Sequence, residues 1–365
     1  MRRLLILVIL SALVVDAQIK DLSTDHPMMV IEMKPGDTHL DAAVRSGEGI
    51  FGRWLTLDTA SVSTRYRHID NFLGATTASN QQYQVVLKGS VVLDGGGRFT
   101  IHAGLFTGNS FTGGWNNAGP GTGVGQSNLF LKQLFIAARP ATGVEIQYGG
   151  LEFARGESSE ITSYDYDGYI VGSRVLIRRP KQAFFDEIGI TYGYVGDLTR
   201  PSVLSRLDHL ARSNYHQLLV AKRAGKRLRI SADYTSDSRV ETCRQAVTFR
   251  APEVRIADSL HFEQYERAGA QAGYGFSAYG ERKLAHGLSF GAGYAQLDAR
   301  GLYSDRFNTG KRLFWNGHIA ISREWSVMTL ATHALSGSPP TSARTRFDLI
   351  VGYNLLRRLQ SAGLF

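Results

Sequence analysis

The sequence predicts an all-β protein, a transmembrane antiparallel up-and-down β-barrel of about sixteen strands, within a range of fourteen to eighteen. Three observations predict it. Segments of roughly nine to eleven residues alternate apolar and polar side chains with a period of two. Short turns alternate with mostly longer connections along the chain. No run of eighteen or more apolar residues follows the N-terminal segment, so the sequence contains no helical membrane span.

The alternation is clearest in a few segments. In residues 83–93, one face carries mostly apolar side chains at every second position, including Leu87 and Val91. The other face carries polar side chains, including Lys88 and Ser90. The same period-two pattern occurs in residues 228–235 and 347–354. A strand that alternates in this way has one apolar and one polar face, and aromatic residues near strand ends suit the two membrane interfaces.

The lengths of the connections predict the direction of each strand. Short connections, expected at the periplasmic end, occur at residues 94–98, 139–143, 179–183, 223–225, 251–256, 284–287 and 323–324. Longer connections, expected outside the cell, occur at residues 69–81, 108–127, 154–167, 197–213, 299–311 and 336–343. Two expected outer connections, at residues 236–239 and 267–271, are short, and the strand register is weakest there.

A soluble β-sandwich also alternates, but three features count against it. Sandwich strands are shorter, and both sheets of a sandwich need one common apolar interior. Here the face opposite the apolar one carries charges in mid-strand, such as Lys88, Arg174 and Asp348. A water-filled lumen accommodates these charges, whereas a dry core does not.

The N-terminus predicts export. Arg2 and Arg3 precede an apolar run at residues 4–15, and Val15 and Ala17 supply the small residues of a cleavage site, so residues 1–17 are predicted to be a signal peptide. Residues 18–50 show no sustained alternation and are predicted to form a periplasmic extension. Two interpretations of this extension stay open, a small plug or partner-binding segment and a disordered leader. The barrel is predicted to span residues 51–365.

Composition excludes several classes of protein. Cys243 is the only cysteine, so an internal disulfide cannot form, and no motif supports a catalytic thiol. The net charge is +9, and loss of Arg2, Arg3 and Asp16 with the signal peptide leaves +8. Nucleic-acid binding is a poor interpretation of this charge in an exported barrel. The sequence predicts no cofactor, and no metal site apart from the calcium alternative at residues 165–168.

Residues 129–178 resemble the alginate-export and related porin barrels. They contain Gln133 in a strand, a Pro-x-x-Gly turn at residues 140–143 and a loop that returns through Asp167-Gly168. The segment departs from that pattern at Gly149-Gly150, where those proteins more often have an Arg-Gln pair. The resemblance implies a porin-like architecture and passive transport, and it names no substrate.

The faces opposite the apolar residues predict a pore lining with an excess of positive charge. The basic residues placed there are Arg65, Arg67, Lys88, Arg174, Arg178, Lys222, Arg227 and Arg229. The acidic residues placed there are Glu145, Asp186, Asp233 and Asp348. Arg178, Lys222 and Arg227 lie near turns, where long basic side chains also reach periplasmic headgroups. The predicted function is a channel for small hydrophilic solutes that prefers anions or anionic saccharides.

Three local features have two interpretations each. The glycine-rich residues 119–125 are predicted to be a flexible loop, because a phosphate loop needs a Lys-Ser/Thr pair and a following helix. The carboxylates at residues 165–168, with Glu157 and Glu160 nearby, predict either a calcium site or a solvated loop. Residues 201–212 predict a short helix, either packed on the barrel rim or folded inward as a constriction.

An enzyme and an adhesin or scaffold are the alternative classes. His209 and His216 flank Ser213, but no set of residues coheres into a hydrolytic site. The expected location is the outer membrane of a Gram-negative-type bacterium. The expected partners are outer-membrane lipids and lipopolysaccharide, small anionic or saccharide solutes, and the barrel-insertion machinery, which would contact the C-terminal strand and its aromatic Phe365.

Signal cleavage is expected after Ala17, because Val15 and Ala17 occupy the small-residue positions of the cleavage site. N-terminal sequencing of the protein purified from outer membranes should begin at Gln18. A protein that keeps Met1 in that membrane fraction would contradict the predicted export signal.

Overall fold

A computed structural model describes residues 54–364 except 111–112, 164–168, 179–183, 198, 239, 252–255, 270–271, 285–286, 299–308 and 337–341. The predicted signal peptide, the extension at residues 18–50, the carboxylates at residues 165–168 and Phe365 lie outside the described residues.

The described chain is almost entirely β-structure. Its strands are β1 (Leu55–Asn71), β2 (Thr76–Val92), β3 (Phe99–Thr107), β4 (Asn116–Gly121), β5 (Leu129–Ala141), β6 (Val144–Glu152), β7 (Tyr169–Arg178), β8 (Glu187–Tyr194), β9 (Tyr215–Ala224), β10 (Leu228–Asp237), β11 (Val240–Arg250), β12 (Ser259–Gly269), β13 (Gly273–Lys283), β14 (Leu288–Leu297), β15 (Gly310–Ala320), β16 (Trp325–Ser336) and β17 (Ala343–Asn354). Two short helices accompany them, the 3₁₀-helix η2 (Val203–His209) and the α-helix α2 (Leu355–Ser361).

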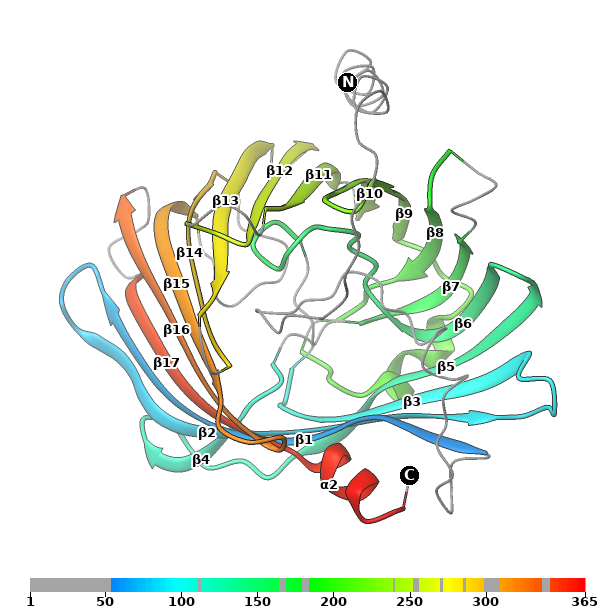
Figure 1. Cartoon of the computed structure of the whole chain (residues 1–365), viewed down its shortest axis with the longest axis horizontal. Coiled ribbons are helices and arrows are strands. Elements are labelled where there is room, and N and C mark those ends of the chain that lie inside the picture. Colours follow the sequence, from blue (N-terminus) through cyan, green and yellow to red (C-terminus); the bar gives the residue numbers. More distant parts are fainter. Residues whose placement is uncertain are drawn as a thin grey trace.

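The strands close into a ring. Apart from β4, the strands pair antiparallel in chain order, so that β3 pairs directly with β5, and β1 pairs with both β2 and β17. Figure 1 shows this order, from the blue β1 through green and yellow to the red β17 beside it. β4 lies in the β3–β5 connection and pairs only with β2. Among the described residues the result is a closed sixteen-strand antiparallel barrel, which confirms the predicted fold class.

Three details differ from the sequence prediction. The first outer turn covers only residues 72–75, because β1 and β2 are each 17 residues long and form one extended hairpin. The connection predicted at residues 108–127 contains β4. The last strand ends at Asn354, whose side chain accepts a hydrogen bond from the Arg357 backbone N–H and caps α2. Residues 355–361 are therefore helical and do not continue the period-two alternation of β17.

The two faces of the barrel wall differ as a membrane requires. Ile190, Leu218 and Phe262 point outward and are 53%, 48% and 55% exposed, whereas Thr191 and Gln217 on the inward face are buried. A continuous apolar outer surface of this size faces lipid and not water. Among the described residues, no helix is both long enough and apolar enough to span a membrane.

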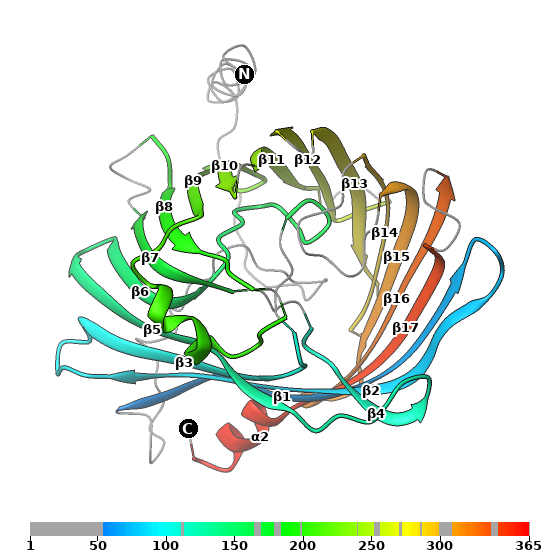
Figure 2. The same ribbon diagram turned by 180° about the vertical axis from the view of Figure 1, so that it is seen from behind.

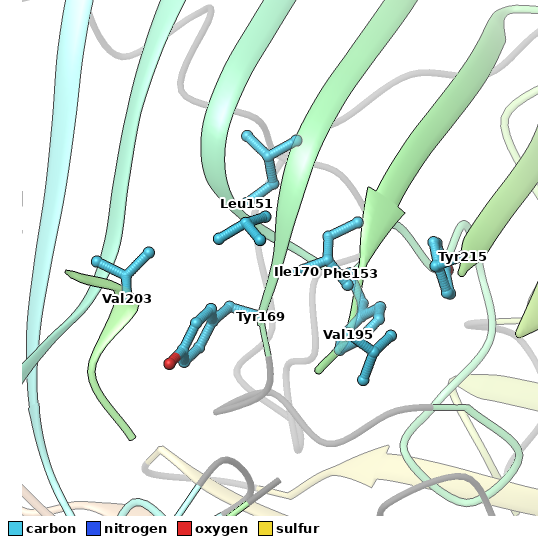
Figure 3. Close-up of a cluster of buried hydrophobic side chains, with 8 residues drawn as sticks. Leu151, Phe153, Tyr169, Ile170, Val195, Val203 and Tyr215 are labelled. Carbon is cyan, nitrogen blue, oxygen red and sulfur yellow. The ribbon is translucent and has the colours of Figure 1, made fainter. Parts of the chain in front are cut away.

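Residues 201–212 form a rim element. η2 packs against β5, β6 and β7 on their outward face, where Val203 occupies the space left by the missing side chain of Gly150. Figure 3 shows Val203 on the same side of β7 as Tyr169. The Tyr169 hydroxyl donates a 2.8 Å hydrogen bond to the Pro201 carbonyl, and the Arg206 guanidinium lies 4.8 Å from the Tyr169 ring centre. The segment therefore covers the outer wall and does not narrow the interior.

Candidate functional site

The segment that follows β6 folds into the interior of the barrel. Figures 1 and 2 both show this segment inside the ring, running toward β12. Near its start the Gln217 side chain donates a 2.7 Å hydrogen bond to the Ala154 carbonyl. Farther on, the Glu157 backbone N–H donates to the Ser231 hydroxyl at 2.7 Å, and the Thr248 hydroxyl donates to the Glu157 carboxylate at 2.9 Å. The segment thus lies along the inner wall from β9 to β11.

The path of the segment requires a glycine at one point. Gly156 has a φ of +60°, in the left-handed region, and its α-carbon lies close against Ser231 and Leu219 of the wall. A side chain at this position would be strained and would collide with the wall. Phe153 fixes the segment just before this point by an edge contact with Tyr215, with ring centres 5.4 Å apart.

One buried carboxylate holds the middle of the segment. Glu263 of β12 is 3% exposed and accepts hydrogen bonds from the Ser159 backbone N–H at 2.6 Å and the Thr162 hydroxyl at 2.7 Å. The hydroxyls of Ser159 and Ser277 also donate to Glu263. Because a buried carboxylate is costly unless several donors satisfy it, this arrangement fixes residues 159–162 firmly to the wall.

An apolar contact completes the attachment. Ile161 packs in a cluster with Tyr265 of β12, Leu297 of β14 and Phe314 of β15. Residues 153–163, named here the inner loop, therefore line the wall from β9 to β15. The wall formed by β1, β2 and β17 faces the inner loop across the interior.

That facing wall carries a cluster of arginines. Asp348 of β17 is fully buried, and its carboxylate lies 2.7 Å from Arg346, 3.1 Å from Arg67 and 3.6 Å from Arg65. These four side chains, named here the arginine cluster, have a net charge of +2. Trp115 covers Arg65, whose guanidinium lies 4.1 Å from the indole ring centre.

Lys88 lies on the next strand of the same wall. Its ammonium pairs with the Glu152 carboxylate and lies 5.2 Å from the centre of the Phe106 ring. Gln133 also donates a 2.8 Å hydrogen bond to Glu152. Lys88 and Arg67 keep side-chain exposures of 22% and 12%, whereas Arg65 is 2% exposed. Lys88 and Arg67 are therefore the predicted basic residues of this wall that reach open interior space.

Arg174 has a different environment. It points inward but is 6% exposed, and its guanidinium donates to the Thr191 hydroxyl at 3.0 Å, to Gln147 and to the Glu152 carbonyl. It supports the place where the chain leaves β6 to form the inner loop, and it contacts protein on several sides.

Three of the other predicted residues lie inside the barrel in ion pairs. Arg178 pairs with Glu187 at 2.9 Å, and Asp233 pairs with Arg244 at 2.9 Å. Glu145 pairs with Arg139 at 3.2 Å.

The remaining predicted residues lie at or near the turns. Arg229 is near the start of β10, on the inward face that it shares with Asp233. Arg227 is in the turn between β9 and β10, and the Asp186 carboxylate accepts a 2.6 Å hydrogen bond from the Arg223 backbone N–H.

Lys222 departs from its predicted side. It shares the outward face of β9 with Leu218 and Val220, pairs across from Ile230, and its ammonium lies 4.0 Å from the centre of the Phe184 ring. The prediction was wrong because residues 218–220 are apolar on both faces of the strand, and alternation alone could not assign the faces. The inward residue, Leu219, is apolar because it packs beneath the inner loop.

Several residues of the site were not found by sequence reasoning. Arg346 lies two residues before Asp348, so extending the alternation of that strand would have found it. No local sequence pattern identifies Trp115 or Glu263 as part of the site, because their partners Arg65 and Ser159 lie far away in the sequence.

Ser213 and His216 meet on the outer side of the rim. The Ser213 hydroxyl and His216 Nε2 lie 2.9 Å apart, and the His216 ring packs against Tyr192. No carboxylate of the described residues forms an ion pair with His216. Within the same part of the chain, no group of three or more His, Cys, Asp or Glu residues is placed to hold a metal ion.

Solved structures share this architecture. OmpF of Salmonella typhi, in a complex with daunomycin, matches with a TM-score of 0.56 and 14% identity, over 84% of this chain and 99% of that chain. A mutant of the Rh. blastica porin matches with a TM-score of 0.55 and 10% identity, over 82% and 99% of the two chains. A triple mutant of the Rhodopseudomonas blastica porin gives a TM-score of 0.54 and 9% identity, over the same shares.

These matches define the class of the fold, which is that of the bacterial porins. No known protein-family profile matches the chain, and no curated protein matches it in sequence. The shared feature is thus the closed sixteen-strand barrel. The narrower resemblance of residues 129–178 to alginate-export barrels stays a prediction.

The attachment of the inner loop should depend on the charge of Glu263. Glu263→Gln replaces one acceptor oxygen by an amide that faces the donors of Ser159 and Thr162, which should weaken the attachment by about 1–3 kcal/mol. Arg155 is 7% exposed, so trypsin should cut the folded native protein slowly there and the variant faster. Glu266→Gln, an exposed position of the same strand, is the control. Equal protection of Arg155 in all three proteins would contradict the proposed attachment.

Proposed function

We propose that the protein is an outer-membrane channel through which small hydrophilic solutes diffuse passively, with a preference for anions or anionic saccharides. The porin fold and the apolar outer wall support a channel in the bacterial outer membrane. The observation that carries the preference is the arginine cluster with Lys88 on one wall, across the interior from the inner loop.

The preference follows from the placement of charge. A positive potential in a narrow passage with low-dielectric walls raises the local concentration of anions and lowers that of cations. Arg67 and Lys88 reach the open interior, and Arg346 and Arg65 hold Asp348 behind them. Asp348 thus orients the arginines while only partly offsetting their charge. No high-affinity site is needed for such selectivity.

The predicted pore-lining residues take different roles in this proposal. Arg67 and Lys88 act on permeating ions, and Arg65 fixes the position of Trp115. Arg174 supports the start of the inner loop, and Lys222 and Arg227 interact with periplasmic headgroups. Arg178, Glu145 and Asp233 stabilise the inner wall through their ion pairs with Glu187, Arg139 and Arg244.

The proposal also covers export and assembly. Residues 1–17 direct export, residues 18–50 form a periplasmic extension and residues 51–365 contain the barrel. The barrel-insertion machinery would bind β17. The outward face of this strand carries Phe347, Leu349, Val351 and Tyr353. Lipopolysaccharide would surround the outer half of the wall.

A hydrolase is the competing function, because Ser213 and His216 are hydrogen bonded at the outer rim. A serine nucleophile also needs an oriented histidine and an oxyanion site. A phospholipid-hydrolysis screen of the native protein and Ser213→Ala tests this alternative, and the channel proposal expects no activity in either.

The channel should prefer chloride in planar bilayers with asymmetric potassium chloride. Arg67→Gln and Lys88→Gln should each lower the chloride-to-potassium permeability ratio by about fivefold. The reason is that one charge about 8 Å away in water changes the energies of the two ions by about 0.5 kcal/mol in opposite directions. The reversal potential measures this ratio.

Lys226→Gln provides the matched control, because Lys226 is exposed in the β9–β10 turn and loses the same charge. Its reversal potential should equal that of the native protein. A well-formed native channel that prefers potassium would reject the anion preference, and a folded barrel without conductance would reject the channel.

A further inference from the structure

We propose that α2 and the adjoining β15–β16 turn form a binding site for the phosphodiester headgroup of an anionic phospholipid in the periplasmic leaflet. The inference rests on the membrane placement within the proposed function, but it does not require conduction. The site consists of Arg323, Arg357 and Arg358, together with the apolar residues beside them.

α2 lies at the periplasmic end of the barrel. α2 packs against β1 and lies outside the ring in both views (Figures 1 and 2). It follows β17 directly, at the end of the barrel where β1 begins and β16 starts. This end is opposite the rim that carries η2 and the inner-loop connection. A helix outside the ring at this end occupies the level of the periplasmic lipid headgroups.

The neighbouring residues mark the same level. Trp325 begins β16, is 48% exposed and packs against Tyr353, with ring centres 4.8 Å apart. Trp54 and Ile321 are 55% and 64% exposed at the same edge. Tryptophan and tyrosine concentrate where acyl chains meet headgroups. The surface around α2 is therefore apolar on the side of the acyl chains.

The helix itself is amphipathic. Leu355, Leu356 and Leu359 are half-buried, whereas Arg357 and Arg358 are exposed. A helix of this kind lies in the interface plane, with its apolar side toward the acyl chains and its basic side toward anionic headgroups.

A hydrogen bond brings the third arginine close. The Arg357 guanidinium donates to the Arg323 carbonyl at 3.1 Å, and the Asn354 backbone N–H donates to the Glu324 carbonyl at 2.7 Å. α2 is thereby joined to the turn that carries Arg323. The Glu324 carboxylate accepts a 3.0 Å hydrogen bond from the Ser322 hydroxyl within that turn.

The chemistry of the cluster identifies the ligand. Arg323, Arg357, Arg358 and Glu324 have a net charge of +2 at a surface where phosphate groups are the abundant anions. Guanidinium groups suit phosphate oxygens, because their planar N–H donors bind two oxygens at once. Arg358 also offsets the negative end of the short helix, and this role does not require a lipid. The experiment separates the two roles.

Native mass spectrometry of the purified full-length protein in detergent tests the site, with dioleoyl phosphatidylglycerol and dioleoyl phosphatidylcholine as separate probes. The native protein should retain phosphatidylglycerol in preference. Arg357→Gln/Arg358→Gln should lower that preference by about tenfold, because each basic residue near an anionic surface contributes to binding. Arg357→Lys/Arg358→Lys should keep most of it.

The control is Lys226→Gln/Lys283→Gln, which removes two exposed positive charges at the same end, one in the β9–β10 turn and one at the end of β13. Its lipid preference should match that of the native protein. Electrophoresis with and without heating should show that every variant remains a folded barrel, and the Lys pair keeps the test valid if the Gln pair does not fold.

Equal retention of both lipids by the native protein, or an equal loss in the control pair, would overturn the site. Conductance measured on the same samples separates this result from the channel proposal. Lipid preference without conductance would reject the channel and keep the site, and conductance without lipid preference would do the reverse.

Discussion

The pairing of β1 with β17 is the constraint on which the rest of the structure depends. A backbone N–H or C=O group that faces lipid without a partner costs several kcal/mol, and an open sheet has two edges of such groups. Eleven register pairs, from Ser61 with Asn354 to Asn71 with Ala343, join the first and last strands and remove both edges. Because the ring is closed, every strand of the ring has one face toward lipid and one face toward an enclosed interior. Polar side chains are then energetically favourable only on the inner face, because the outer face contacts hydrocarbon.

The enclosed interior explains the unusual number of buried charges. Asp348, Glu263, Arg244 and Arg174 are each no more than 6% exposed, which would be unfavourable in a soluble sandwich without partners. Here each has hydrogen-bonding partners from a neighbouring strand or from the inner loop. The inner loop covers one side of the interior, so the charges beneath it act structurally. On the β1, β2 and β17 wall, the charged side chains of Arg67 and Lys88 remain beside open space, and both are basic.

The local periodicity of the sequence was sufficient to predict the fold. It failed to predict the face of a side chain where that face depends on packing between distant parts of the sequence. The alternation around Leu87 and Lys88 placed the two residues on opposite faces of one strand, and the pattern of turns led to the correct number of strands. Lys222 was misplaced because Leu219 is apolar and yet points inward, a fact that depends on contact with Gly156 of the inner loop. The path of that loop depends on Glu263, about a hundred residues away in the sequence. No short-range pattern specifies such a contact.

The central claim is that a water-filled passage runs between the inner loop and the β1, β2 and β17 wall. Thiol accessibility tests it most directly, using Arg67→Cys and Val62→Cys, which lie on opposite faces of β1, each in a Cys243→Ser background. A charged, membrane-impermeant methanethiosulfonate should reduce the planar-bilayer current through the Arg67→Cys channel, because that thiol would face the passage. It should leave the Val62→Cys current unchanged, because Val62 points outward and is 42% exposed on the lipid side. Equal block at both positions, or no change at Arg67→Cys, would contradict the account.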